Sequence, residues 1–172
     1  MPIVPLIKAT ELQGKKVFYA TFDKSLIPTV TDIAEMMGMD EIIMVGYPNG
    51  LWDSVNNLPI FRRGILASDY SRDWNGKKEF LIDAACFPGS SGSPIMLFDI
   101  GSYRTKQGLF LAASRIKLLG VLYGGPQYAA EGDIEVVTVP TLEKAASIAG
   151  IPINFGIGIT PERLLDFEGL FK

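Results

Sequence analysis

Residues 79–99 read Glu-Phe-Leu-Ile-Asp-Ala-Ala-Cys-Phe-Pro-Gly-Ser-Ser-Gly-Ser-Pro-Ile-Met-Leu-Phe-Asp, in which a turn rich in glycine and serine separates two apolar runs. The runs at 79–85 and 94–99 have the length of strands and are bounded by turn-forming residues. Pro94 suits the first residue of a strand, where no ladder N–H is required. A flexible linker would not be embedded between two core strands, so the turn at 89–94 is a candidate functional site.

The rest of the chain repeats this pattern of short apolar segments separated by glycine, proline and asparagine, which is typical of a β-barrel or sandwich. Further strands are predicted at 17–22, 41–47, 60–68, 117–123, 134–139 and 154–159. Residues 109–114 could pair locally with 117–123. We expect a mainly β fold with one six-stranded antiparallel barrel, built from 41–47, 60–68, 79–85, 94–99, 117–123 and 154–159.

Signals for helices and tight turns are fewer. Short helices are predicted at 29–37, 141–149 and 161–168. The helix at the C-terminus has Thr160 as its N-cap, Pro161 at its first position and Gly169 at its end, which is the usual placing of these residue types. Asn75-Gly76 lies between two strand-like runs and predicts a hairpin turn, because both residues tolerate positive φ.

The length and composition of the chain exclude several classes of protein. Its 172 residues fit one barrel with its terminal helix over 39–172, which leaves 1–38 as an apolar connecting arm. A net charge of −3 without a basic cluster argues against nucleic acid as a partner. No apolar run has the length of a membrane span, and the first twenty residues lack the apolar core of a signal peptide.

Cys86 is the only cysteine and there is no histidine, so neither an internal disulfide nor a zinc site of the usual nitrogen and sulfur type can form. The chain also lacks the aspartate-rich loop of calcium sites and the glycine-rich loops of nucleotide binders. We therefore expect no cofactor and no metal. A single cysteine without a signal peptide favours the cytoplasm.

The turn at 89–94 has the residue types that stabilise a tetrahedral oxyanion. Such an anion needs two N–H donors directed at one point. A glycine two residues before a serine lets the chain turn sharply, so that the N–H groups of Gly89 and Ser91 can converge. The Ser91 hydroxyl would be the nucleophile, but a serine hydroxyl reacts poorly until a neighbouring base removes its proton. The usual base is histidine, which this chain lacks.

The chain resembles one group of bacterial trypsin-like serine peptidases, which are related in fold to chymotrypsin and the HtrA proteases. The stretches that carry this resemblance are 45–51 (Val-Gly-Tyr-Pro-Asn-Gly-Leu), 57–64, 80–84 and 87–94 (Phe-Pro-Gly-Ser-Ser-Gly-Ser-Pro). It is strong from about 41 to 98, weaker at 119–125, and returns at 154–168, which resembles the final strand and helix of that fold. The resemblance implies a Greek-key barrel of the chymotrypsin type.

The resemblance also implies roles for individual residues. Ser91 would be the catalytic nucleophile, and the N–H groups of Gly89 and Ser91 would form the oxyanion hole. Ala85 would be the floor of the primary specificity pocket, which implies an apolar or small substrate side chain. Ser90 stands where many relatives have an acidic residue, so no ion pair is implied there. The strand that pairs with a substrate backbone would consist of Tyr123, Gly124 and Gly125.

Other polar or reactive residues have simpler interpretations. Ser114-Arg115-Ile116-Lys117 has the spacing of serine–lysine enzymes, but positions three apart on a strand point to opposite faces. Arg62 and Arg63 are interpreted as a solvated strand edge. Cys86 has no histidine to pair with, so we interpret it as a small buried hydrophobic residue.

The chain departs from the family in one respect that decides its function. These peptidases use two barrels, and the first carries the histidine and the aspartate. Residues 1–6 resemble the strand that follows that aspartate, so we expect the second barrel alone. The first hypothesis is a fragment of a serine endopeptidase, completed in cis or in trans by the missing barrel. The alternative is a histidine-free pseudoprotease that binds an extended peptide along 123–125. The face left open predicts self-association, with 1–38 covering it or exchanging between chains.

Overall fold

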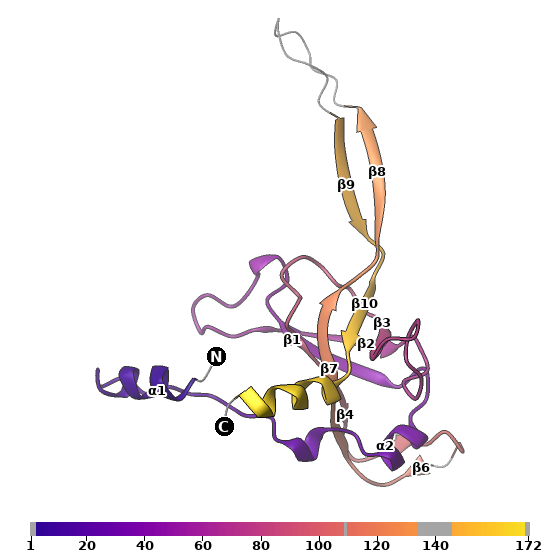
Figure 1. The fold of residues 1–172 in the computed structure, drawn as a ribbon, viewed down its shortest axis with the longest axis horizontal. Coiled ribbons are helices and arrows are strands. Elements are labelled where there is room, and N and C mark those ends of the chain that lie inside the picture. The colour runs from indigo at the N-terminus through magenta and orange to yellow at the C-terminus, as the bar shows by residue number, and fades with distance from the viewer. Residues whose placement is uncertain (1–2, 109, 134–145, 171–172) are drawn as a thin grey trace, which may run out of the picture.

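The computed structural model describes residues 3–108, 110–133 and 146–170, and it is mainly β with a few short helices (Figure 1). A closed antiparallel barrel forms its centre, and its six strands are those that the sequence predicts. In order around the barrel, they are β1 (Glu41–Gly46), β2 (Ile60–Leu66), β3 (Glu79–Asp83), β10 (Phe155–Ile159), β7 (Arg115–Gly124) and β4 (Pro94–Asp99).

The strand order has the pattern of a Greek key. β1, β2 and β3 follow one another in sequence and in space, whereas β4 crosses back to pair with β1 on its other side. β10 and β7 then close the barrel between β3 and β4. The segment that joins β3 to β4 must therefore cross one end of the barrel, and this segment contains the serine turn at 89–94.

Alternate residues of the barrel strands point inward and form the core. Ile42 and Met44 of β1, and Phe80 and Ile82 of β3, are at most 1% exposed. Burying one such side chain contributes roughly 1.5–3 kcal/mol. The Phe80 ring is accommodated by glycine, because a Cβ added at Gly158 would lie 2.5 Å from its Cζ atom. The alternation of inward and outward residues along each strand is therefore the pattern that fills the barrel.

A buried ion cluster joins β4 and β7 to the residue before β1. The Arg115 guanidinium lies 2.8 Å from the Asp99 carboxylate and 3.2 Å from that of Asp40. Burial alone would lower the pKa of Arg115, but hydrogen bonds and charge from the two carboxylates raise it above its usual value. The arginine is also stacked on the Tyr103 ring, 4.4 Å from its centroid. All its charge is therefore compensated inside the fold.

The helices agree only partly with the sequence prediction. α2 (Val30–Glu35) is shorter than the predicted 29–37, and it begins with a capping box between Thr29 and Asp32. The C-terminal helix is present but is a 3₁₀-helix, η3 (Pro161–Leu170). Thr160 lies at the predicted N-cap position, and its carbonyl accepts a hydrogen bond from the Arg163 N–H, but its hydroxyl is buried without a hydrogen-bond partner. Two further 3₁₀ turns are η1 (Lys24–Leu26) and η2 (Pro48–Gly50).

Over its described residues, 3–38, the arm before the barrel contains no strand. The strand predicted at 17–22 is wrong, since these residues lie outside any strand and Phe18 is 94% exposed. A closed barrel has no free edge to which this segment could add. The start of the chain, expected to resemble a strand, forms the helix α1 (Val4–Glu11), which has no buried residue and projects from the barrel (Figure 1). Within the described residues, no helix has the length and apolar character to cross a bilayer.

Three local predictions have mixed outcomes. The Asn75-Gly76 turn is confirmed: both residues have positive φ, and Trp74 pairs with Lys77 across it. The local pairing expected for 109–114 is wrong, since β6 (Phe110–Leu111) pairs with β5 (Tyr103–Arg104) instead. The strand predicted at 134–139 lies outside the described residues.

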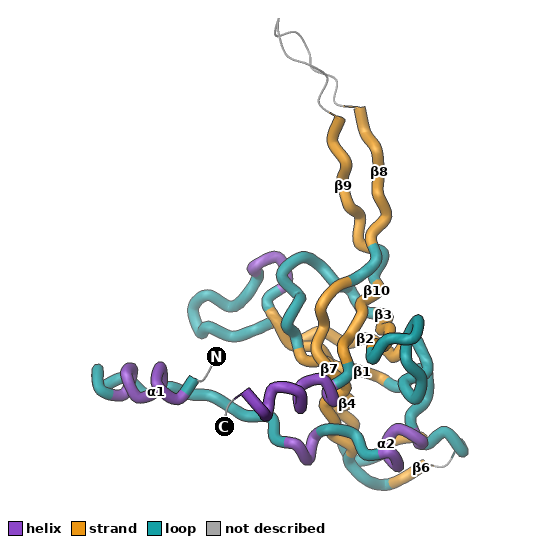
Figure 2. The backbone as a smooth tube through the Cα atoms, viewed as in Figure 1, coloured by secondary structure: helices purple, strands orange, loops and turns teal. Residues whose placement is uncertain are grey.

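Beyond the barrel, β8 (Gln127–Asp133) and β9 (Ala146–Pro152) form a separate two-stranded ribbon. Figure 2 shows this ribbon projecting from the barrel at the point where β7 and β10 leave it. The helix predicted at 141–149 is wrong over 146–149, which belong to β9, and its remaining residues lie outside the described ones. Pairing with β8 therefore decides the structure of residues 146–149, although their local sequence favours a helix.

Candidate functional site

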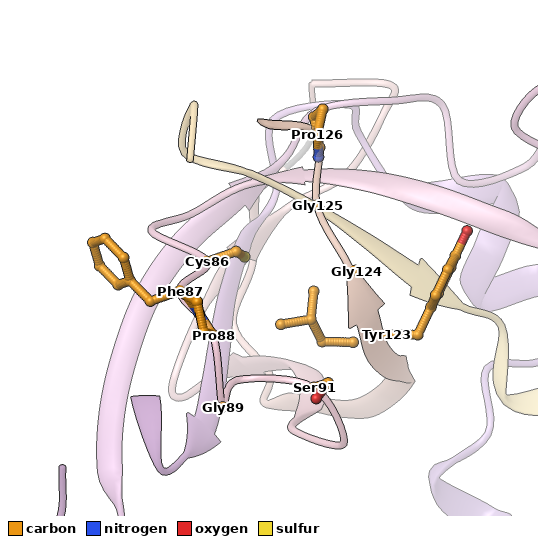
Figure 3. Close-up of a pocket in the computed structure, with 10 residues that line it drawn as sticks. Cys86, Phe87, Pro88, Gly89, Ser91, Tyr123, Gly124, Gly125 and Pro126 are labelled. Atoms are coloured by element: carbon orange, nitrogen blue, oxygen red, sulfur yellow. The ribbon is translucent and has the colours of Figure 1, made fainter. Parts of the chain in front are cut away.

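The serine turn and the end of β7 form the two walls of one small pocket. Ser91 and Gly89 lie on one wall and residues 123–126 on the other, facing each other in Figure 3. The pocket has a volume of about 150 Å³. The residues that line it are Cys86, Phe87, Pro88, Gly89, Ser91, Leu122, Tyr123, Gly124, Gly125 and Pro126. Five of the six predicted site residues are therefore brought together by the fold; only Ala85 lies outside this lining.

One hydrogen bond sets the orientation of the peptide that precedes Gly89. The Pro88 carbonyl accepts a hydrogen bond from the Asn49 N–H, with an N···O distance of 2.6 Å. In a planar trans peptide the N–H points opposite to the carbonyl, so the Gly89 N–H is directed away from Asn49. Among the described residues, no acceptor is bonded to the N–H of Gly89 or of Ser91. Two donors on the pocket wall are therefore available to an anion.

Gly89 is required by the turn on two grounds. Its φ is +84°, in the region that favours glycine. A Cβ at this position would also lie 2.9 Å from the Tyr47 carbonyl oxygen and 3.1 Å from the Asn49 nitrogen. Any side chain would therefore push the turn away from η2. The sequence predicted glycine's role in the sharp turn, but not the close approach to 47–49.

The opposite wall is the end of a strand. Leu122 is paired with the serine turn through two backbone bonds, from Gly92 N to its carbonyl (2.7 Å) and from its N to the Ser93 carbonyl (2.9 Å). Tyr123, Gly124 and Gly125 continue past this pairing, and within the described residues no strand is paired with them on the Ser91 side. An extended peptide placed between this edge and Ser91 would therefore find unoccupied backbone groups.

Arg62 supports the serine turn from inside the barrel, which corrects the interpretation of this residue as part of a solvated edge. Its Nη2 donates to the Ser90 hydroxyl at 2.8 Å, and its Nη1 donates to the Ala85 carbonyl. Ser90 is 1% exposed. Arg63 does behave as predicted, with an exposed side chain that pairs with Glu41 at the surface.

The charge of Arg62 lacks a counterion among the residues that the structure describes. Within the described residues, no carboxylate forms an ion pair with it, and its Nε has no hydrogen-bond partner. Burial lowers the pKa of Arg62 below its usual value, and the neighbouring Cys86 opposes this shift. The residue could have been found in the sequence, because Arg62 shares the period-two phase of the inward-facing Gly64 and Leu66.

Cys86, and not its neighbour Ala85, belongs to the lining of the pocket. Ala85 is half-buried, and its carbonyl is held by Arg62, whereas Cys86 lines the pocket. The Cys86 sulfur packs against Gly156, where an added Cβ would lie 2.5 Å from it. Burial raises the pKa of the Cys86 thiol above its usual 9.0, partly opposed by Arg62. The thiol is therefore protonated at neutral pH, and the pocket wall it forms is apolar.

No base accompanies Ser91. Its hydroxyl makes no hydrogen bond to any described residue, and the residues that line the pocket include no carboxylate or amine. The serine–lysine spacing at 114–117 serves the fold: the Ser114 hydroxyl accepts a bond from the Gly101 N–H, and Lys117 pairs with Asp32 at 2.8 Å. Within the described residues no cluster of potential metal ligands occurs.

The site therefore has a hydroxyl, two unpaired N–H donors and a strand edge, but the described part of the chain places no proton acceptor beside the hydroxyl. Such a site can hold an extended peptide and an oxyanion, but cannot by itself activate the serine. Comparison with known proteins adds no name to this geometry, since no family model and no curated protein matches the chain.

Proposed function

We propose that this chain carries the nucleophile half of a serine-peptidase site. Ser91 is the nucleophile, and the N–H groups of Gly89 and Ser91 are the oxyanion hole. The observation that supports this most directly is the bond from Asn49 to the Pro88 carbonyl, because it turns the neighbouring N–H away from η2 and leaves it unpaired. Gly89 and Ser91 are exposed, so their N–H groups face water in the absence of a ligand, and an oxyanion beside Ser91 would accept a hydrogen bond from each.

The ligand we propose is an extended polypeptide. Its backbone lies against Tyr123, Gly124 and Gly125, and one side chain enters the pocket beside Cys86. A volume of about 150 Å³ and a lining without charged side chains favour a small or apolar side chain there. This agrees with the substrate preference that the resemblance implied through Ala85, although the neighbouring residue supplies the wall.

Alone, the chain should bind such a peptide without cleaving it. Removing the base from a serine triad lowers turnover roughly 10⁶-fold, and the oxyanion hole and binding alone leave about 10³–10⁴ over water. Peptide-bond cleavage then depends on a histidine supplied by another polypeptide segment, in cis or in trans. A histidine-free pseudoprotease is the second candidate, and the unbonded Ser91 hydroxyl is compatible with both.

A peptide boronic acid tests the half-site directly. A tripeptide ending in the boronic acid analogue of alanine places boron where the scissile carbonyl carbon would lie. The Ser91 oxygen bonds to boron, its proton passes to water, and the boron becomes a tetrahedral anion held by the two N–H groups. We expect binding with a tetrahedral signal in boron NMR, lost in Ser91→Ala. A boronate that binds Ser91→Ala equally well would refute the assignment of Ser91.

Fluorophosphonate labelling separates the two candidates. The purified chain should react at Ser91 only at the rate of an ordinary serine. If a histidine-bearing segment completes the site, the same serine should be labelled rapidly in an extract of the cells that make the protein, and Ser91→Ala should remain unlabelled there. Slow labelling in both settings would favour the pseudoprotease, whereas rapid labelling of the purified chain would contradict the half-site.

A further inference from the structure

The ribbon of β8 and β9 begins where the pocket ends. Pro126 is the last residue of the pocket wall, and β8 starts at the next residue. The two strands pair in an unbroken antiparallel register from Gln127↔Pro152 to Asp133↔Ala146. Figure 1 shows them leaving the barrel as a continuation of β7 and β10. The ribbon is therefore attached to the same chain segment that forms the proposed peptide-binding edge.

The free edge of β8 is continuous with the edge at 123–125. β7 leads into β8, and β9 leads into β10, so the pairing of β8 with β9 prolongs the pairing of β7 with β10. On its other side, β7 is paired with β4 and then with the serine turn. The unpaired edge of β8 therefore continues the edge of β7 that faces Ser91. The twist of the ribbon rotates this edge as it leaves the barrel.

A two-stranded ribbon of this kind is incomplete by itself. Isolated pairs of strands are marginally stable in water, and each edge exposes a row of unpaired N–H and C=O groups. Proteins usually blunt such edges with lysine or proline. β8 reads Gln-Tyr-Ala-Ala-Glu-Gly-Asp and contains neither, whereas β9 ends in Pro152. The sequence of β8 therefore leaves its edge able to accept a third strand.

We propose that the β8 edge binds the same extended polypeptide as the pocket, by strand addition. The part of the ligand on the amino side of the residue at Ser91 runs along 123–125 and continues along β8. The edge from Tyr123 to Asp133 has eleven residues, of which Pro126 has no N–H to donate, and it would lie opposite a ligand segment of about ten residues. The ligand is then an unfolded or extended polypeptide segment, not a short peptide or a small ester. Only the starting point at Ser91 rests on the proposed function.

Two boronates that differ in length test this proposal on the whole protein. The first is the tripeptide boronate, and the second carries the same three residues with seven more on the amino side. If β8 pairs with the added residues, the long boronate should bind about tenfold more tightly or better, since several backbone hydrogen bonds are added. Equal affinity of the two would overturn the proposal while leaving the assignment of Ser91 intact.

Methylation of single ligand nitrogens shows whether backbone pairing causes the gain. Alternate N–H groups of a strand face its partner, so methylation at every second added residue should abolish the gain, and methylation at the residues between should spare it. A gain that survives methylation everywhere would overturn the proposal. A variant in which residues 127–152 are replaced by a short glycine–serine turn should keep the affinity for the tripeptide boronate and lose the gain.

Failure of the proposed function is distinguishable from failure of this inference. If the tripeptide boronate does not bind, the half-site is wrong, and the long peptide with a carboxamide in place of the boronic acid then tests β8 alone by fluorescence anisotropy. Binding that is lost in the variant with residues 127–152 replaced would sustain the inference, and its absence would end it. Sedimentation gives a further test. A dimer that is lost when residues 127–152 are replaced, and that the long peptide does not dissociate, would also overturn the inference.

Discussion

The Arg62 guanidinium donates a hydrogen bond to the hydroxyl of Ser90, the residue immediately before Ser91, with an N···O distance of 2.8 Å. The bond connects an inward-facing position of β2 to the serine turn across the end of the barrel. On the other side of the turn, Asn49 holds the Pro88 carbonyl. Hydrogen bonds thus connect the turn to two different parts of the barrel. Together they fix the direction of the Gly89 and Ser91 N–H groups.

Replacing Arg62 should disorder the serine turn. In Arg62→Met, the buried Ser90 hydroxyl and the Ala85 carbonyl lose their donor. We expect a loss of about 1–3 kcal/mol in the free energy of unfolding, measured with urea, and about tenfold weaker binding of the tripeptide boronate. Arg63→Met is the matched control, since Arg63 is the exposed neighbour and should change neither quantity measurably. Unchanged boronate binding in Arg62→Met would show that the turn does not need this support.

Replacing Gly89 should remove the oxyanion hole more than it destabilises the fold. Gly89→Ala forces a Cβ against Tyr47 and Asn49, so the turn must shift. We expect about hundredfold weaker boronate binding, comparable to the loss of one oxyanion donor. Gly101→Ala is the control, because Gly101 has a φ of +86° but open space around its missing Cβ. The two variants should share the cost of positive φ, roughly 1 kcal/mol, and differ in binding.

The ion pair between Asp32 of α2 and Lys117 of β7 should make the free energy of unfolding depend on pH in the acid range. Burial alone would raise the pKa of Asp32, but hydrogen bonds from Lys117 and Thr29 outweigh it and hold that pKa below the usual 3.8. A carboxyl whose pKa is lowered by folding stabilises the fold fully above its unfolded value. The contribution is then lost as pH falls from about 3.8 through the folded value.

We therefore expect Asp32→Asn to cost about 1 kcal/mol at pH 7, where it loses the ion pair with Lys117 and the charge that accepts the Thr29 hydrogen bonds, and to cost progressively less below pH 3.8. Urea unfolding of wild type and Asp32→Asn at several pH values measures the difference in free energy of unfolding at pH 7 and its decrease below pH 3.8. Asp166→Asn, which removes an exposed pair with Arg163 at the surface, should have little effect at any pH. A constant difference between wild type and Asp32→Asn from pH 7 to pH 2.5 would contradict the assigned pair.

The Cys86 thiol should report on occupancy of the pocket. Because burial raises its pKa above 9.0, little thiolate is present at pH 7, and iodoacetamide should react much more slowly than with the unfolded chain. The reaction should accelerate as pH rises towards 10. Boronate binding should protect the thiol, as followed by mass spectrometry, and the protection should disappear in Ser91→Ala. Alkylation that is indifferent to bound boronate would place the ligand elsewhere.

Much of the fold was predictable because its signals are local. The six barrel strands were predicted from short apolar runs bounded by turn-forming residues, and Asn75-Gly76 from its tolerance of positive φ. The errors occur where a segment's partner decides its structure. Residues 17–22 have the composition of a strand, yet the closed barrel offers them no edge. Residues 146–149 have helix signals, yet they pair with β8.

The candidate site divides in the same way. Gly89 and Ser91 are close in sequence, so one motif was enough to predict that their N–H groups share a turn. Arg62 lies 28 residues from Ser90 in the chain, and their contact follows from barrel closure and strand register. Barrel closure and strand register also produce the pocket wall at Cys86, the hydrogen bond from Asn49 and the edge of β8. The sequence alone determined the strands, the serine turn and the absence of histidine, because these depend on residue type and spacing. Only the tertiary structure decided what supports the turn and what faces it, because those contacts join residues that are distant in the chain.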